Sequence, residues 1–248
     1  MKQKEWFREW FDSSWYHKLY FERNELEAQQ FLSRLINYLK CADGCRMLDV
    51  ACGKGRHSRY LASLGYDVTG IDLSPNSIQY ARQFETANLS FYEHDMRSPF
   101  WTNYFDYTFN FFTSFGYFAT FRENTKAIKM MIQSLKSSGT LVLDYLNVHY
   151  CEERLVPDEI KPVNGTNFEI VRWQDDTHFY KQITIPEKHK QVFTEKICKF
   201  TISDFTEMLS FFNMQITDVF GDYALNRYDT RNTPRMIIIA KKEKRSAT

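Results

Sequence analysis

Short apolar runs alternate with amphipathic patterns between residues 24 and 146. Apolar positions three and four residues apart predict helices, and short apolar runs bounded by turn residues predict strands. The predicted helices lie at 24–39, 57–64, from Ser74 onward and at 128–135, and the predicted strands lie at 47–51, 68–71, 89–95, 104–112 and 140–146. Because strands that alternate with helices form βαβ units, the pattern predicts a doubly wound α/β fold with a mostly parallel sheet.

Local signals predict where these helices begin and end. Asn24 and Glu27, three residues apart, form a plausible N-cap pair for the first helix. Gly65 is expected to stop the second helix, and Ser74 followed by proline is expected to open the third. Gly139 is expected to close the helix at 128–135. These positions set the predicted boundaries between helices and loops.

The pattern changes outside this region. Residues 1–23 are aromatic and charged, and we expect them to form an N-terminal cap that closes one side of the site. Residues 147–200 lack helical periodicity and predict a strand meander at 168–174, 178–185 and 191–200, with breaks at 175–176 and 186–187. Since ligands bind beyond the carboxyl ends of parallel strands, this insertion is expected to form a lid over the substrate. Residues 201–241 return to helix and strand and complete the domain begun at 24–146, and 242–248 is a polar tail.

Composition narrows the class of protein. The 248 residues carry a formal net charge of +1, which gives no electrostatic footprint for nucleic acid. No apolar run reaches the roughly 18 residues of a membrane span, and the first residues lack the apolar core of a signal peptide. Five cysteines show no metal-ligand spacing, and their odd number argues against a disulfide framework. We therefore expect a cytoplasmic protein with reduced thiols and no bound metal.

Glycines and an acid mark the first two strand ends. Gly53 and Gly55 lie in the first strand-to-helix turn, where the backbone can approach a ligand closely. Asp72 ends the next strand, and a carboxylate there can accept hydrogen bonds from the two hydroxyls of a ribose. These residues predict an adenosine-like ligand, either NAD(P) or S-adenosylmethionine. A dinucleotide fingerprint needs a third glycine, but the two possible registers place Ser58 or Arg56 there, which opposes NAD(P).

The turn reads Asp49-x-Ala51-x-Gly53-x-Gly55, which resembles motif I of the class I S-adenosylmethionine-dependent methyltransferases, with alanine at the first glycine. The resemblance continues at the acidic loop 72–74, at Asp95-Met96 after the third strand and at 110–112 after the fourth. It covers about 24–146 and 201–241 and implies a seven-stranded sheet whose last two strands are antiparallel. More narrowly, "ACGKGRHS" with "NFFTSFGYF" resembles bacterial methyltransferases of the small-molecule type.

The resemblance implies specific contacts to S-adenosylmethionine. Asp72 would hold the ribose, Asp95 would face the adenine amine, and Asp49 would brace the N–H groups of the glycine turn. The implied cofactor-binding residues are Asp49, Ala51, Cys52, Gly53, Gly55, Asp72, Leu73, Asp95, Met96, Asn110 and Phe111. Tyr20 and Arg23 of the cap are additional candidates for binding the methionine carboxylate, whereas His57 falls on an apolar helical face and is predicted to be a packed histidine.

The acceptor is less well defined by the sequence. Tyr117, Tyr145 and His149 follow the fourth and fifth strands on the ligand side and are candidates to bind a substrate. No catalytic base is assigned, because methyl transfer needs one only when the attacking atom must lose a proton. Residues 110–113 lack the prolines of base amino-methyltransferases, so we expect a small-molecule acceptor, with no nucleic acid or membrane partner. Two alternatives remain at this point, an NAD(P)-dependent oxidoreductase and a non-catalytic S-adenosylmethionine-binding partner protein.

Overall fold

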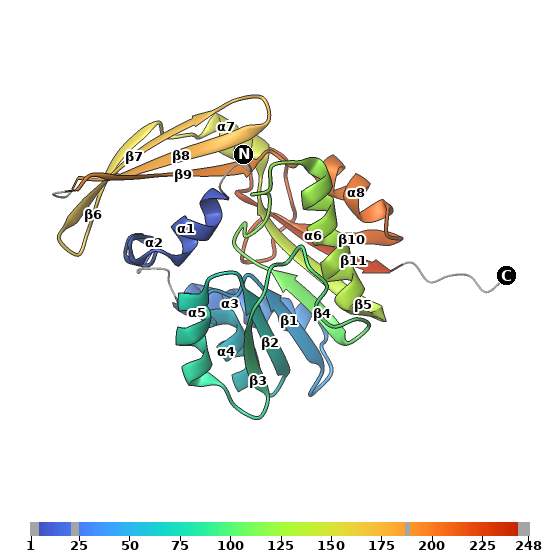
Figure 1. Ribbon diagram of the computed structural model, residues 1–248. Helices are drawn as coiled ribbons and strands as arrows, with labels where there is room; N and C mark the ends of the chain where they lie inside the picture. Colours follow the sequence, from blue (N-terminus) through green and yellow to red (C-terminus); the bar gives the residue numbers. More distant parts are fainter. Residues whose placement is uncertain (1–4, 21–24, 187–188, 243–248) are drawn as a thin grey trace.

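The central layer of the molecule is a seven-stranded sheet, sheet A, in the computed structural model, which describes residues 5–20, 25–186 and 189–242. In spatial order its strands are β10 (Met214–Phe220), β11 (Arg235–Lys242), β5 (Leu135–Leu146), β4 (Phe105–Asn110), β1 (Arg46–Val50), β2 (Asp67–Asp72) and β3 (Leu89–Glu93) (Figure 1). Strands β1 to β5 run parallel to one another, and β11 is antiparallel to both β5 and β10. The predicted doubly wound, mostly parallel sheet is confirmed.

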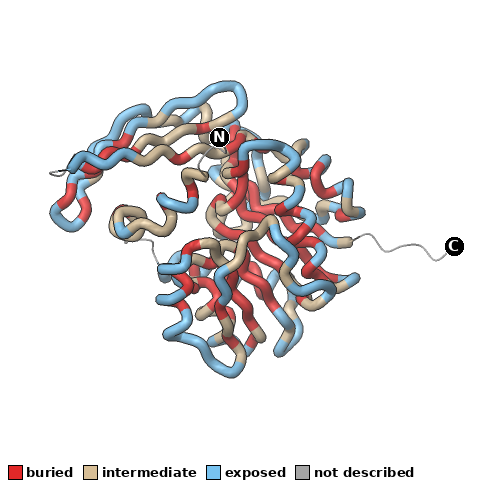
Figure 2. Tube along the Cα trace, viewed as in Figure 1, coloured by how far each residue is buried: buried red, intermediate tan, exposed pale blue. Residues whose placement is uncertain are grey.

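Helices cover both faces of sheet A. One apolar core joins the sheet to α3 (Glu25–Leu39), α4 (Arg56–Ser63) and α5 (Pro75–Ala81), which is followed by the short helix η1 (Arg82–Phe84). A second core joins the opposite face to α6 (Phe121–Ser134) and α8 (Ile202–Ser210). Figure 2 shows buried residues running through the strands between these two layers. The sheet is therefore fully enclosed, which explains its continuous apolar strands.

Most predicted helix ends are found where the sequence placed them. Gly65 has φ +93° and directly follows the last turn of α4. The Ser74 hydroxyl accepts the Ser77 N–H at the start of α5, with proline in the first position. The prediction for Gly139 is wrong, because α6 ends at Ser134 and Leu135 is buried as the first residue of β5. Asn24, the predicted cap of α3, lies outside the described residues.

Residues 147–200 form the predicted antiparallel meander, with one strand more than expected. Sheet B contains β6 (Asp158–Val163), β7 (Thr166–Gln174), β8 (His178–Ile185) and β9 (Gln191–Cys198), in that order. The missed strand, β6, contains Pro162 and lies at the edge of the sheet, where a missing N–H is tolerated. Helix α7 (Val148–Glu153), between β5 and β6, was also missed.

The N-terminal cap lies between the two sheets. It consists of α1 (Trp6–Asp12) and α2 (Ser14–Leu19), which Figure 1 shows beneath sheet B. Trp10 and Leu19 pack into an apolar cluster with the inner face of sheet B, while Phe7 packs into the core of sheet A. Sheet B therefore meets sheet A both through the cap and directly at Cys198, which lies in the core of sheet A.

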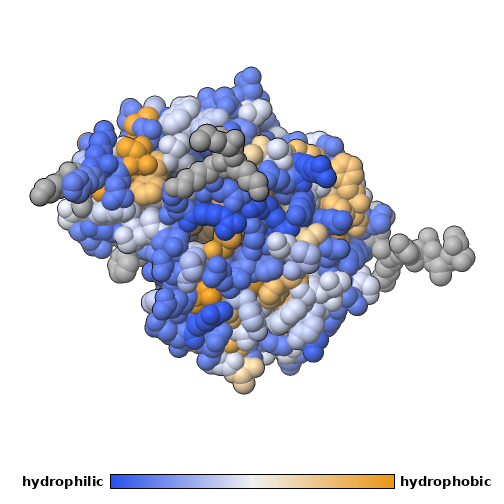
Figure 3. Space-filling view, viewed as in Figure 1, coloured by the Kyte–Doolittle hydropathy of each residue, from blue (hydrophilic) through white to orange (hydrophobic). Residues whose placement is uncertain are grey.

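The face shown in Figure 3 is mostly hydrophilic, with several apolar patches, one of which lies over sheet B. Ile160, Val171 and Trp173 of sheet B are among its exposed large apolar residues. Across the described ranges, no helix combines the length and the hydropathy that crossing a membrane requires.

Candidate active site

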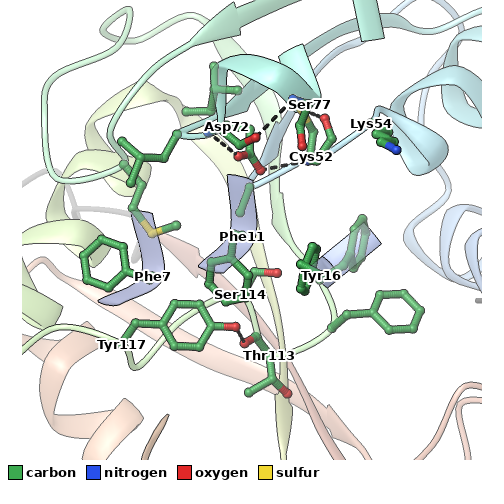
Figure 4. A pocket seen from close by; sticks show the side chains of 18 of the residues that line it. Phe7, Phe11, Tyr16, Cys52, Lys54, Asp72, Ser77, Thr113, Ser114 and Tyr117 are labelled. Carbon is green, nitrogen blue, oxygen red and sulfur yellow. Dashed lines mark hydrogen bonds between the residues drawn. The ribbon is translucent and has the colours of Figure 1, made fainter. Parts of the chain in front are cut away.

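A cavity of about 720 Å³ opens at the carboxyl ends of β1, β2 and β4 and is bounded on the other side by the cap and the lid. Ten of the predicted site residues line it: Tyr20, Ala51, Cys52, Gly53, Asp72, Leu73, Asp95, Met96, Phe111 and Tyr117. In Figure 4, Phe11 of the cap lies between Asp72 on one side of the cavity and Tyr117 on the other. The volume lies within the range of small-molecule sites, about 300–1,000 Å³.

The glycine turn meets the cavity at Gly53. This residue has φ +55°, and a Cβ added there would have no protein atom within 4 Å, because the position borders open space. Gly55 has a different role, since its Cβ would lie 2.5 Å from the Phe91 ring. Gly55 therefore allows α4 to pack against β3 and does not line the cavity, although we predicted that it would bind the cofactor.

Ala51 stands where motif I has its first glycine and adopts φ +62°. A left-handed conformation costs an L-residue about 1–2 kcal/mol, which exceeds the entropic advantage of alanine over glycine. We expect Ala51→Gly to raise the free energy of unfolding by about 0.5–1 kcal/mol. Urea denaturation checks this, with Ala62→Gly inside α4 as the control that should lose about 1 kcal/mol. A less stable Ala51→Gly variant would contradict the expectation.

Asp72 links the glycine turn to the loop after β2. Its Oδ2 accepts the Gly53 N–H and its Oδ1 accepts the Ser74 N–H, both at 2.8 Å. Burial raises the pKa of this carboxyl above its usual value, although the backbone N–H groups oppose that rise. Each carboxylate oxygen can accept a second hydrogen bond. Asp72 lines the cavity and therefore retains acceptor capacity where a ribose hydroxyl could bind.

Asp49 is buried beneath the glycine turn and does not line the cavity. Its Oδ2 accepts the Ser58 hydroxyl at 2.6 Å, so it braces the first turn of α4. We had predicted that it would brace the N–H groups of the glycine turn, and none of its hydrogen bonds to described residues does so. Burial raises the pKa of Asp49 to about 7.

This raised pKa predicts a pH-dependent stability. Between about pH 4 and pH 7 the folded chain keeps a proton on Asp49 that the unfolded chain has released. The free energy of unfolding should therefore fall as pH rises through that window. We expect the free energy of unfolding of Asp49→Asn, relative to that of the wild type, to rise by about 2 kcal/mol between pH 5 and pH 8. Urea denaturation of both proteins at pH 5 and pH 8 measures the gain. If the difference in stability between Asp49→Asn and the wild type is the same at both pH values, the raised pKa of Asp49 is contradicted.

Asp95 lies at the cavity wall beside Met96, with its carboxylate held by two arginines. Arg97 binds it at 2.7 Å and Arg8 of the cap binds it at 3.2 Å. Burial alone would raise the pKa of Asp95, but the Arg97 hydrogen bonds outweigh it and lower the pKa. The carboxylate is therefore ionised and joins the cap to the end of β3. Its contact with adenine stays a prediction.

The loop after β4 contains two left-handed residues, Phe112 with φ +58° and Thr113 with φ +57°. Such a conformation is unusual for a β-branched residue and needs support from the surrounding structure. Asn110, a predicted cofactor contact, does not line the cavity, because its amide donates to the Val50 and Ser114 carbonyl oxygens. Phe111 and Phe112 do line it.

A buried carboxylate, Asp144 of β5, supports this loop. It accepts the Phe112 N–H at 2.8 Å and lies 2.6 Å from the Arg235 guanidinium of β11. Arg235 in turn donates to the Thr113 hydroxyl at 3.0 Å, and Tyr223 donates to Asp144 at 3.1 Å. No local pattern in the sequence indicates this network, because it joins the antiparallel last strand to the fifth and only the sheet order brings the residues together.

Three predicted contacts need correction. Tyr145 is buried in the core of sheet A, and its hydroxyl donates to the Cys198 carbonyl. His149 is exposed on α7, where it pairs with Glu152. Neither residue is among those that line the cavity. Tyr20 lines the cavity, but its single hydroxyl proton is donated to Glu195 and not to a cofactor carboxylate. Arg23, its predicted companion, lies outside the described residues.

The cap contributes more to the site than the sequence indicated. Phe7 and Phe11, four residues apart on α1, both line the cavity and pack against Tyr117. At the end of α1, Asp12 accepts the Ser74 hydroxyl at 2.6 Å and the Asn76 N–H at 3.1 Å. The spacing of Phe7 and Phe11 is the signal that would have identified this face of α1. The cap is thereby attached to the acidic loop after β2.

These residues fit an adenosyl ligand. Asp72 offers acceptor capacity for a ribose hydroxyl, and Gly53 leaves space for close approach. Leu73, Met96 and Phe111 line the neighbouring wall and can contact a flat base. His57, which also lines the cavity, is buried and stacks on Phe112 at 5.1 Å, as expected for a packed histidine.

Curated relatives are methyltransferases that match parts of the chain. A Bacillus subtilis protein named as a methyltransferase is 34% identical over 40% of this chain and 41% of its own length. A methyltransferase of a Geobacillus strain is 29% identical over 52% of this chain and 54% of its own length. The chain thus spans about half of these relatives or less. A Streptomyces venezuelae protein named as a dTDP-amino-sugar N,N-dimethyltransferase is 29% identical over 40% of this chain and 41% of its own length.

Solved structures share the fold. An S-adenosylmethionine-dependent methyltransferase of Clostridium acetobutylicum superposes with a TM-score of 0.75 at 16% identity, covering 92% of this chain and 96% of its own. The amino pentose methyltransferase CalS10 of Micromonospora echinaspora, solved with S-adenosylmethionine bound, has a TM-score of 0.67 at 20% identity and covers 93% and 98%.

A family model described as a methyltransferase domain matches residues 42–213, which is more than half of the chain. The assignment agrees with the resemblance found at motif I and is against the NAD(P)-dependent alternative. The chain therefore belongs to the methyltransferase domain family, and its fold is shared with an S-adenosylmethionine-dependent methyltransferase of known structure.

Proposed function

We propose that the protein transfers a methyl group from S-adenosylmethionine to a small-molecule acceptor held between the end of sheet A, the cap and the lid. The observation that carries the proposal is the cavity itself, which combines the Asp72 and Gly53 site with a second wall of Phe11, Tyr117 and Glu195. This second wall distinguishes an enzyme from a cofactor-binding partner protein, which needs no enclosed space for an acceptor.

The chain's residues divide between two tasks. On the cofactor side, Asp72 holds the ribose, Gly53 allows close approach, and Asp95 with Met96 lies against the base. On the acceptor side, the loop at Phe112 and Thr113 lies where a methionine moiety and an acceptor would meet. When bound, S-adenosylmethionine supplies an electrophilic methyl group on a positively charged sulfur.

Positioning is the main contribution of the protein. Holding the attacking atom about 3 Å from the methyl carbon and in line with its bond supplies much of the rate. The cap and lid exclude water from the reacting atoms. No general base is assigned. The acceptor is a small molecule in this proposal, with no nucleic acid partner, and the free cysteines suit the reducing cytoplasm.

A methyl-transfer assay tests the proposal. The protein is incubated with methyl-labelled S-adenosylmethionine and a metabolite extract, and label is followed into small molecules. We expect saturable cofactor binding by calorimetry and labelled products that are absent with Gly53→Val, whose branched side chain occupies the open space at the turn. Binding of NADH in place of S-adenosylmethionine would overturn the proposal.

A further inference from the structure

The lid places one buried carboxylate over the cavity. In the register of β8 and β9, Glu195 lies directly opposite Lys181, next to the apolar pair Ile183 and Phe193. Glu195 is only 9% exposed and lines the cavity. A charge in such a position is expensive unless it has a partner. Glu195 must therefore be stabilised by hydrogen bonds or by a cation.

One oxygen of Glu195 is fully used by the cap. Oε1 accepts the Trp10 indole N–H at 2.7 Å and the Tyr20 hydroxyl at 3.0 Å. The nearest cation to Oε2 is Lys181, whose Nζ lies 3.9 Å away, beyond hydrogen-bond distance. Within the described ranges, Oε2 accepts no hydrogen bond from the protein. Glu195, a residue of the cavity wall, thus has one carboxylate oxygen with spare acceptor capacity.

Lys181 compensates this charge only in part. Its ammonium group donates to the Tyr20 hydroxyl, so its nearest hydrogen-bond acceptor is that phenol and not the carboxylate. Burial lowers the pKa of Lys181, and the neighbouring Glu195 carboxylate opposes that shift. A ligand that brings its own N–H donors and positive charge would therefore satisfy Oε2 better than the protein does.

We propose that Oε2 of Glu195 binds a basic amino group of the methyl acceptor, so that the substrates are small amines. The inference rests on the proposed function and names its acceptor class. An ionised carboxylate accepts N–H donors strongly and repels acids. If that nitrogen is the one methylated, its ammonium form first releases one proton to water, and the lone pair of the neutral amine then forms the N–C bond while the C–S bond breaks with its electron pair on sulfur. The product is a methylated ammonium ion, whose N–H groups Glu195 can accept.

The substitution Glu195→Gln separates ligand binding from a purely structural role. A glutamine oxygen still accepts from Trp10 and Tyr20, which keeps the cap on the lid, but the negative charge is lost. Glu169→Gln is the matched control, because it removes the same charge from the exposed outer face of sheet B. Unfolding by urea establishes that both variants are folded.

The test measures the binding of three probes that share one ring: cyclohexylamine, cyclohexanol and cyclohexanecarboxylate. Calorimetry is performed with and without S-adenosylhomocysteine. For the wild type and Glu169→Gln, we expect the amine to bind about tenfold tighter than either other probe, the scale of one charge-assisted hydrogen bond. Glu195→Gln should abolish that preference and leave the affinity for S-adenosylmethionine unchanged.

Two results would overturn the inference. One is the absence of an amine preference in the wild type, including a failure of all three probes to bind. The other is an equal loss of affinity for all three probes in Glu195→Gln, which indicates a structural role alone. Failure of S-adenosylmethionine to bind the wild type is a separate result that contradicts the proposed function, while the probe series without cofactor still decides the amine preference.

Discussion

Asp72→Ala is expected to weaken the binding of S-adenosylmethionine by about 1.5–3 kcal/mol, the scale of a hydrogen bond to a charged group. The carboxylate oxygens already accept the Gly53 and Ser74 N–H groups, so the substitution removes the ribose acceptors and loosens the glycine turn together. Calorimetry on both proteins measures the loss. Equal affinity would refute the ribose assignment.

A control residue for this experiment lies on the same strand. Asp67 begins β2 at the opposite end of sheet A, where its half-exposed side chain lies 3.8 Å from Arg46. Asp67→Ala removes the same charge far from the cavity and should leave cofactor affinity within error of the wild type. If both variants lose affinity for S-adenosylmethionine, the loss reflects a disturbance of β2 and not the removal of a ribose contact.

Asp144→Ala is expected to lower the free energy of unfolding by about 2–4 kcal/mol. The range is slightly below that for a fully buried pair because the Arg235 side chain remains 17% exposed. The substitution leaves the Arg235 charge without its counter-ion, and the Phe112 N–H and Tyr223 hydroxyl lose their acceptor. Urea denaturation measures the change.

A double variant separates the charge from the loop. Asp144→Leu combined with Arg235→Met removes both ions, and replacing a buried pair by apolar residues commonly restores stability. We expect the double variant to be more stable than Asp144→Ala, yet to bind S-adenosylmethionine more weakly than the wild type, because the left-handed residues Phe112 and Thr113 lose their support. A double variant as unstable as the single one would contradict this explanation.

The parallel part of the fold could be predicted because its signals are local. The strand at 47–51 and the helix after it follow from apolar spacing within a few residues, and Gly65 and Ser74 act on their own helix ends. Leu135 shows where this fails. Its burial against Phe105 of β4 starts a strand four residues before Gly139, and that contact depends on tertiary packing.

The cofactor half of the site was predictable for the same reason, and the acceptor half was not. Gly53 and Asp72 are fixed by their own strand ends, so their positions follow from the βαβ pattern. Glu195 and Arg235 reach the cavity from sheet B and from the antiparallel last strand, and no local spacing indicates either. Tyr145 lies on the predicted strand, but its side chain is on the wrong face of the sheet. Successive side chains of a strand point to opposite faces, so an error of one residue is enough to cause this.

The bridge from Trp10 to Glu195 has a consequence for how the molecule forms. Helices α1 and α2 contain seven and six residues, too few to be stable in isolation, and the two bridged residues are 185 positions apart. The cap is synthesised before its partner strand, β9, so the Trp10 indole has to wait for Glu195 before this hydrogen bond can form. Until β9 is present, the Glu195 carboxylate is not available to accept from Trp10 and Tyr20, so we expect the two short helices of the cap to become ordered only after sheet B has formed.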